Sequence, residues 1–119
     1  MDINFNKNED HNRLLLSDLK QRFAKVKLGG GEKRIKKLHA EGKMTARERI
    51  DYLLDEKAKS IEIGAFVGDG MYAEHGGCPS GGVVVKMGYI KGKQCIVVAN
   101  DATVKAGAWF PITGKKNLR

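Results

Sequence analysis

Residues 81–107 read GGVVVKMGYIKGKQCIVVANDATVKAG and hold most of the contiguous β-branched residues of the chain. Two apolar runs, 83–90 and 95–99, flank a short turn around Gly92, and this pattern predicts a β-hairpin. Lys-Gly is less typical of a type I′ turn than Asn-Gly, so the turn type stays open. The second run does not alternate with polar residues, as expected of a strand covered on both faces. It leads into a small-residue loop at 103–108, where backbone amides can approach a ligand closely.

The length of 119 residues corresponds to one modest domain or a piece of a larger one. No apolar run approaches the ~20 residues of a membrane span. The first twelve residues, MDINFNKNEDHN, lack the apolar core of a signal peptide. We therefore expect no membrane partner and a disordered tail over residues 1–10.

The two cysteines, Cys78 and Cys95, do not form the pattern of a disulfide framework. Two free thiols and no export signal predict a reducing, cytoplasmic location. His75 and Cys78 supply too few ligands for a metal centre, so no metal site is expected.

The net charge of +8 is concentrated between residues 20 and 37, where eight Lys and Arg residues accompany a single acid, Glu32. Such a patch attracts phosphates of a nucleic acid or a nucleotide cofactor, or an acidic partner. A solvated helix face is the alternative interpretation.

Three helices are expected before the hairpin. The first starts at an Asp10 cap and runs to about Leu28, because apolar residues recur at helical spacing; these are Leu15, Leu19, Phe23 and Val26. Three glycines at 29–31 end it, as a C-cap and flexible joint and not as a phosphate loop, since the GxxxxGK[ST] pattern is absent. The second helix covers 32–41, with His39 interpreted as a surface or interface residue.

The third helix begins with a capping box in which Thr45 and Glu48 exchange backbone hydrogen bonds. It runs to about Leu54, and an ion pair between Arg47 and Asp51 is expected at i, i+4. Its residues 50, 53 and 54 should face inward, and the hairpin is the expected partner of the helices.

The sequence predicts a short strand over residues 60–64 and a long glycine-rich loop over residues 64–82. Residues 115–119 resemble the first turn of a further helix, which suggests a truncated domain. The sequence contains no recognisable catalytic motif. Composition and periodicity predict an α+β protein with a phosphate-binding face.

Three segments resemble the carboxyltransferase (β) subunits of biotin-dependent acyl-CoA carboxylases. Residues 29–50 are similar to the family's GGGxxRIxxxHxxGKLTARERI signature, and 55–66 to its LLDxGSFxEIGxF segment, with Lys-Ala-Lys at 57–59 replacing small residues. Residues 82–103 are similar to GVVTGIGxINGxxVVVxANDxTV. Residues 99–116 look most like the methylcrotonyl-CoA and geranyl-CoA branch, because the propionyl-CoA branch typically has Phe where this chain has Ala102 and Gly-Gly-Ser around Gly107.

The resemblance implies a crotonase-like fold, of which 11–59 would be a helical lead-in and 60–119 the first, incomplete ββα turn. It also implies carboxyl transfer from carboxybiotin to an acyl-CoA, with biotin carried by a partner. The expected partners are the biotin carboxylase and biotin carrier subunits, and further copies of the carboxyltransferase subunit. The enolate-stabilising loops of the family lie beyond Arg119, so no catalytic residue is assigned.

Part of the CoA site is implied within the chain. By analogy with crotonase-like proteins, the loop Lys105-Ala106-Gly107 meets the adenine end of CoA, while Arg34 or Lys37 meets its phosphates. For each residue, a purely structural or subunit-contact role is the alternative. Two other functions stay open: a basic nucleic-acid-binding module, disfavoured because the aromatic residues are not interleaved with the basic stretch, and a non-catalytic assembly element with uncovered sheet edges.

Overall fold

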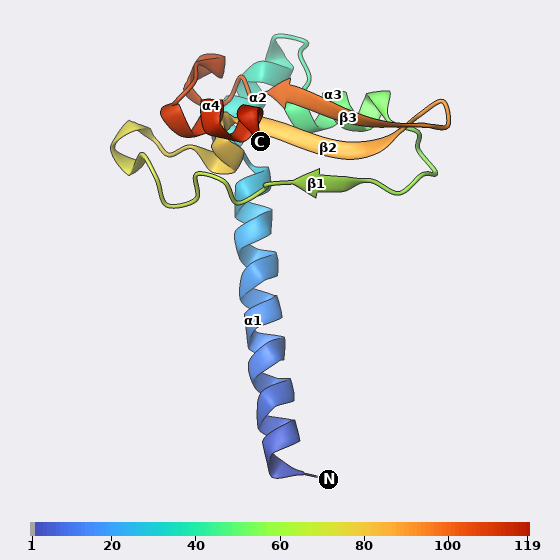
Figure 1. Ribbon diagram of the computed structural model, residues 1–119. Helices are drawn as coiled ribbons and strands as arrows, with labels where there is room; N and C mark the ends of the chain where they lie inside the picture. The colour runs from blue at the N-terminus through green and yellow to red at the C-terminus, as the bar shows by residue number, and fades with distance from the viewer. Residues whose placement is uncertain (1) are drawn as a thin grey trace.

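The computed structural model describes residues 2–119, which form four α-helices and one three-stranded antiparallel sheet (Figure 1). The helices are α1 Ile3–Lys27, α2 Glu32–Ala40, α3 Ala46–Leu53 and α4 Pro111–Leu118. The strands are β1 Ile61–Ile63, β2 Val83–Ile90 and β3 Lys93–Asn100, in the spatial order β1-β2-β3. The predicted strand at 60–64 and the predicted hairpin are therefore confirmed.

Helix α1 projects from the body of the molecule along most of its length (Figure 1). It begins at Ile3, where the Asp2 carboxylate accepts a hydrogen bond from the Asn4 amide at 3.0 Å. The predicted start at Asp10 is wrong, and so is the prediction of a disordered tail for residues 3–10. The Asp2 side chain caps the helix eight residues before the predicted start at Asp10.

The apolar stripe of α1 packs only at its C-terminal end. Val26 is buried and the Phe23 ring lies 6.0 Å from that of Phe66. Leu15 and Leu19 keep 54% and 48% of their surface exposed. Helical periodicity located the stripe correctly, but within residues 2–119 nothing covers its first half.

The glycine triplet that ends α1 is not a flexible joint, contrary to the prediction. A Cβ on Gly30 would lie 1.8 Å from the carbonyl oxygen of Thr103, and the Gly30 amide donates to Thr103 Oγ1 at 2.9 Å. Gly29 adopts φ +53, and a Cβ there would lie 2.5 Å from the Asp101 carboxylate. The triplet packs closely against Asp101 and Thr103, directly after β3.

The capping box of α3 is confirmed. The Glu48 amide donates to Thr45 Oγ1 at 3.2 Å, and Glu48 Oε2 accepts from the Thr45 amide at 2.8 Å. The predicted pair between Arg47 and Asp51 is wrong, because each side chain reaches across to the sheet. Arg47 binds Glu62 on β1 at 2.7 Å, and Asp51 binds Lys86 on β2 at 2.6 Å.

The hairpin turn consists of two residues, Lys91 and Gly92, with φ of 49° and 78°. Two positive φ values are the signature of a type I′ turn. The Asp55 carboxylate accepts both turn amides, each at 2.8 Å. This clamp from the end of α3 holds a turn whose own residues favour it only weakly.

Helix α3 covers one face of the sheet, which confirms the expected helix–hairpin contact for this helix. Ala46, Ile50 and Leu54 form a buried cluster with Val84 of β2. Leu53, which was expected to face inward, is 50% exposed. The opposite sheet face is open: Ile96 and Val98 of β3 are 64% and 53% exposed, so the prediction of a strand covered on both faces is wrong for residues 2–119.

The long connection 64–82 packs against α4 and the end of the sheet. A second buried cluster joins Cys78, Val104 and Phe110, with the Tyr72 ring stacked 4.4 Å from that of Phe110. Helix α4 starts at Pro111, four residues before the turn predicted from the sequence. No helix within residues 2–119 has the length and apolarity needed to span a membrane.

Candidate functional site

A cavity of about 470 Å³ lies between α2 and the loop that follows β3. Helix α2 contributes one wall, and the loop 102–106 contributes the other. The lining side chains include four cations and one carboxylate: Arg34, Lys37, Lys43, Lys105 and Glu41. This balance favours a ligand with several negative charges.

The cavity unites most of the residues that the family resemblance nominated. Arg34 and Lys37 extend from α2, and Lys105 and Ala106 come from the facing loop. Gly107 does not line the cavity; its amide donates instead to the carbonyl of Val104 at 2.9 Å. Four of the five nominated positions are thus neighbours in space, although about seventy residues separate the two groups in sequence.

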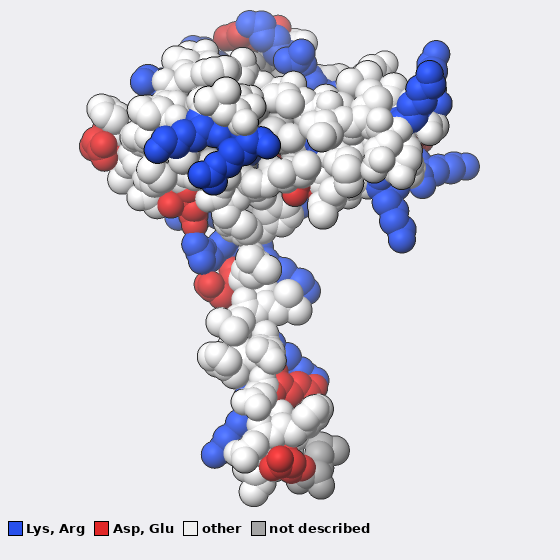
Figure 2. All heavy atoms as spheres, viewed as in Figure 1, with Lys and Arg blue, Asp and Glu red and all other residues white. Residues whose placement is uncertain are grey.

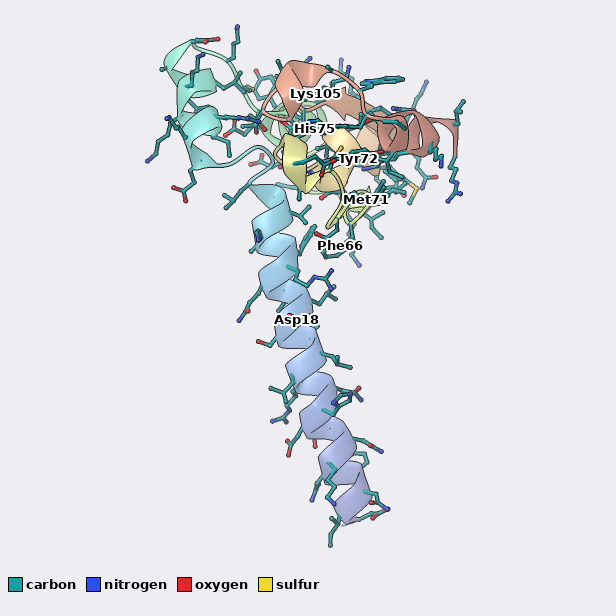
Figure 3. All side chains as sticks on the ribbon, turned by 90° about the vertical axis from the view of Figure 1, so that its left-hand side faces the viewer. Asp18, Phe66, Met71, Tyr72, His75 and Lys105 are labelled. Atoms are coloured by element: carbon teal, nitrogen blue, oxygen red, sulfur yellow. The ribbon has the colours of Figure 1, made fainter. Side chains whose placement is uncertain are left out.

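The loop at 105–107 has an unusual backbone. Lys105, Ala106 and Gly107 have φ of 47°, 53° and 84°, so three consecutive residues are left-handed. Only glycine adopts this conformation without strain, and strained residues are commonly found at functional sites. The Lys105 ammonium lies 4.3 Å from the centre of the buried Phe110 ring, next to Tyr72 and His75 in Figure 3. This cation–π contact helps to hold the turn.

Arg34 has a structural contact as well as a place in the cavity wall. Its Nη1 donates to the Thr103 carbonyl oxygen at 2.9 Å. Thr103 is held in turn by the buried Asp101 carboxylate, which accepts from the Thr103 amide at 2.9 Å and from its hydroxyl at 2.6 Å. This network explains why an Asn-Asp-x-Thr sequence after the strand matters: it fixes the wall of the cavity opposite α2.

Lys43 and Glu41 were missed by sequence reasoning. Lys43 follows the Gly42 stop of α2, and its amide returns to the Leu38 carbonyl at 3.1 Å, which places the side chain at the cavity. Its ammonium pairs with Glu41 at 2.9 Å. The Lys43 hydrogen bond, together with the charges of Lys43 and Lys37, lowers the pKa of Glu41. A lysine directly after a helix-ending glycine was the signal available in the sequence.

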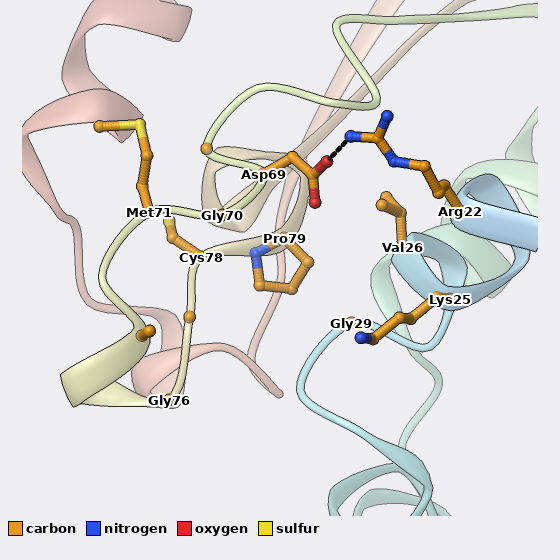
Figure 4. Close-up of a pocket in the computed structure, with 13 residues that line it drawn as sticks. Arg22, Lys25, Val26, Gly29, Asp69, Gly70, Met71, Gly76, Cys78 and Pro79 are labelled. Atoms are coloured by element: carbon orange, nitrogen blue, oxygen red, sulfur yellow. Dashed lines mark hydrogen bonds and ion pairs between the residues drawn. The ribbon is translucent and has the colours of Figure 1, made fainter. Parts of the chain in front are cut away.

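A second cavity, of about 520 Å³, lies between the end of α1 and the glycine-rich loop 68–79 (Figure 4). An ion pair between Arg22 and Asp69 lies at this cavity. Burial raises the pKa of the Cys78 thiol, which therefore stays protonated and is a poor nucleophile. Among residues 2–119, no three His, Cys, Asp or Glu side chains are grouped to hold a metal ion.

The fold and the first cavity define an α+β protein with a cationic recess suited to a phosphorylated ligand. The chain belongs to the carboxyl transferase domain family, whose sequence profile matches residues 37–119. The match begins within α2 and includes the whole sheet and the strained loop.

Several curated relatives carry the same segment. The chain is 40% identical over 110 residues to the biotin-dependent 3-methylcrotonyl-coenzyme A carboxylase beta1 subunit of Mycobacterium tuberculosis, covering 92% of this chain and 20% of that one. It is 46% identical over 105 residues to a probable mitochondrial methylcrotonoyl-CoA carboxylase beta chain of Drosophila melanogaster, covering 88% and 18%. The chain thus spans about a fifth of the length of the curated relatives it matches.

Solved structures agree on the fold. The beta subunit of P. aeruginosa geranyl-CoA carboxylase superimposes with a TM-score of 0.81 at 27% identity, covering 99% of this chain and 22% of that one. Transcarboxylase 12S, solved as a hexamer with methylmalonyl-coenzyme A bound, gives 0.77 at 32% identity, covering 89% and 21%. These neighbours confirm the predicted start of a crotonase-like carboxyltransferase fold, and the relatives agree with the methylcrotonyl-CoA and geranyl-CoA resemblance.

Proposed function

We propose that this chain is the N-terminal part of a carboxyltransferase subunit that transfers a carboxyl group from carboxybiotin to an acyl-CoA of the 3-methylcrotonyl-CoA type. The observation that carries the proposal is the family match over residues 37–119, shared with methylcrotonyl-CoA carboxylase subunits. Because the chain spans about a fifth of those subunits, it is catalytically incomplete alone. An assay with free carboxybiotin and 3-methylcrotonyl-CoA should give no carboxylated product, and detectable transfer by the isolated chain would contradict incompleteness.

The cavity between α2 and the loop 102–106 is the proposed contact for the nucleotide end of CoA. CoA carries a diphosphate and a 3′-phosphate, and the lining has four cations against one carboxylate. Lys37 is exposed and has no ion-pair partner within residues 2–119, so its ammonium is free to meet a phosphate. The backbone of Lys105 and Ala106, the two loop residues of the predicted adenine contact that line the cavity, would face the adenine.

Calorimetry with CoA tests this contact on the intact chain. Lys37→Ala should weaken binding by about 2- to 5-fold, as expected for an exposed charged contact to phosphate, and the effect should shrink at high salt. Lys105→Ala should also weaken binding, because it removes the cation–π contact that helps to hold the turn proposed to face the adenine. Lys7→Ala, which removes an exposed cation on α1 far from the cavity, is the matched control. A folded chain that binds no CoA, or that binds single-stranded RNA in preference, would refute the contact and leave family membership intact.

The proposed partners follow from the same reaction. Carboxybiotin would arrive on a biotin carrier subunit charged by a biotin carboxylase, so biotin is not attached to this chain. The complete subunit would assemble with copies of itself, and the hexamer of transcarboxylase 12S supports that expectation. Pull-down of a biotinylated carrier protein by the complete subunit is the direct test.

The proposed compartment is the reducing cytoplasm, supported by two cysteines that are both free. Several relatives are named as mitochondrial chains, which makes the mitochondrion the alternative compartment. Fractionation of cells that express a tagged chain separates the two locations.

A further inference from the structure

One face of the sheet carries an ordered array of apolar side chains, which we call the open sheet face. The strand register aligns Ile63, Val85 and Val98 in one row across the sheet. It aligns Ile61, Met87 and Ile96 in the next row. All six positions are apolar, although β1 ends at Ile63 and the hairpin of β2 and β3 begins only at Val83.

The open sheet face has no cover within residues 2–119. Ile61 and Ile63 of β1 are 58% and 44% exposed, and Ile96 of β3 is 64% exposed. Helix α3 packs on the opposite face, where Ile50 is 1% exposed. Figure 2 shows the open sheet face as a largely uncharged area with Lys and Arg side chains at its margins. Contiguous apolar surface of this kind marks an interaction site.

A second feature lies beside the open sheet face. Strand β3, Lys93–Asn100, pairs with β2 on one side only and is an edge of the three-stranded sheet. Its outer edge presents unpaired backbone groups, which makes it a template for an added strand. A partner that covers the apolar face can therefore also extend the sheet.

We infer that the open sheet face and the β3 edge form the docking surface for the remaining part of a carboxyltransferase subunit. This inference rests on the proposed function. The same fold superimposes over 99% of this chain on a subunit nearly five times longer, so four-fifths of that subunit is available to supply the missing layer. An apolar second layer stacked about 10 Å away is the usual cover of such a sheet face.

A second copy of this chain fits the surface less well. Each copy carries a net charge of +8, and Lys91 and Lys93 lie at the hairpin end of the open sheet face. Face-to-face pairing of two copies would bring these like charges together. Charge therefore favours the complementing part of the subunit over self-association.

Fragment complementation tests the inference. The 119-residue chain is co-expressed with a truncated Drosophila methylcrotonoyl-CoA carboxylase beta chain that lacks its own matched segment, and complex formation is followed by size-exclusion chromatography with light scattering. The Drosophila segment supplied in trans is the positive control. A 1:1 complex is expected for the 119-residue chain, and its absence where the positive control assembles would overturn the inference.

Paired charge substitutions identify the surface. Ile96→Lys with Val98→Lys should weaken the complex about 100-fold or more, because two ammonium groups would be buried against apolar surface. Tyr52→Lys, at a side chain that is 83% exposed and outside the face, is the matched control and should assemble normally. Circular dichroism is used to check that both variants keep their helices. Equal assembly of both variants would overturn the inference.

A single-chain chimera covers the case in which the truncated partner is insoluble alone. This chain replaces the matched segment of the Drosophila subunit, and the melting temperature of the chimera is measured with and without the Ile96→Lys and Val98→Lys changes. A chimera that folds but is insensitive to those changes would argue against the docking surface. Carboxyl-transfer activity is measured separately, so a stable complex without activity would contradict the proposed function alone. The isolated chain could instead form dimers that the Ile96→Lys and Val98→Lys changes disrupt and that the partner does not displace. Such dimers would identify a second copy of the chain as the occupant of the open sheet face.

Discussion

Gly30 joins the helical part of the chain to the end of β3, and replacing it with alanine should unfold much of that connection. A Cβ on Gly30 would lie 1.8 Å from the Thr103 carbonyl oxygen and 2.5 Å from its carbon, so backbone must move by more than an ångström. That movement breaks the hydrogen bond from the Gly30 amide to Thr103 Oγ1 and strains the one from Arg34 to the Thr103 carbonyl. One neutral bond and one charge-assisted bond are together worth about 2–4 kcal/mol.

Urea unfolding followed by circular dichroism measures this loss. Gly30→Ala should lower the free energy of unfolding by about 2–4 kcal/mol, a large share of the 5–15 kcal/mol typical of a domain. Gly114→Ala is the matched control, because no atom lies within 4 Å of a Cβ built there and the position is inside α4. The control should be neutral or stabilising by about 0.5–1 kcal/mol. A Gly30→Ala loss below about 0.5 kcal/mol, the size of an ordinary surface effect, would refute the reasoning.

Two further predictions concern partly or fully buried charges: the ion pair of Arg47 with Glu62, and Lys116. Glu62→Gln leaves Arg47 without its counter-charge at a site where the Glu62 and Arg47 side chains are 6% and 14% exposed, so stability should fall by about 3 kcal/mol in urea unfolding. A loss under about 1 kcal/mol would show that the counter-charge of Glu62 is not needed there. Burial lowers the pKa of Lys116 from 10.5 to about 8, so the unfolded chain binds the extra proton between those pH values. The free energy of unfolding should then rise with pH from about 8 upward, by at most about 1.4 kcal/mol per pH unit. The Lys116→Met variant should lack this rise. If the difference in free energy of unfolding between the two proteins does not change with pH, the hydrogen bonds from Lys116 to the Ser80 and Val83 carbonyls, each 2.6 Å long, offset the cost of burial.

Local rules predicted the elements whose causes are local. The capping box at Thr45 and Glu48 and the two apolar runs of the hairpin are patterns of residues close together in sequence, and both elements are present. The hairpin turn itself is also held by Asp55, from outside the hairpin. The partner of Arg47 was mispredicted for the opposite reason. Asp51 and Glu62 were both possible partners. Arg47 pairs with Glu62, which lies on a strand whose position depends on the whole fold.

The candidate site was predictable only through family resemblance. Arg34 and Lys105 share a cavity because the close approach of Gly30 to Thr103 brings α2 to the loop after β3. No sequence pattern within α2 or within the loop after β3 predicts that approach. Lys43 shows the same limit: its charge is plain in the sequence, but its direction depends on how the chain returns beneath α2 after Gly42.

Strand β3 shows where a mismatch between pattern and environment is informative. Its unbroken apolar run is typical of a strand buried on both sides, yet Ile96 and Val98 face solvent within residues 2–119. Val97 and Ala99, on the other face, pack against the α3 cluster, so one half of the pattern is already explained by this fold. The other half matches the edge position of β3 and the apolar rows across the sheet. The apolar pattern of β3 therefore fits a strand that a second layer covers on its open face, as the inferred docking surface requires.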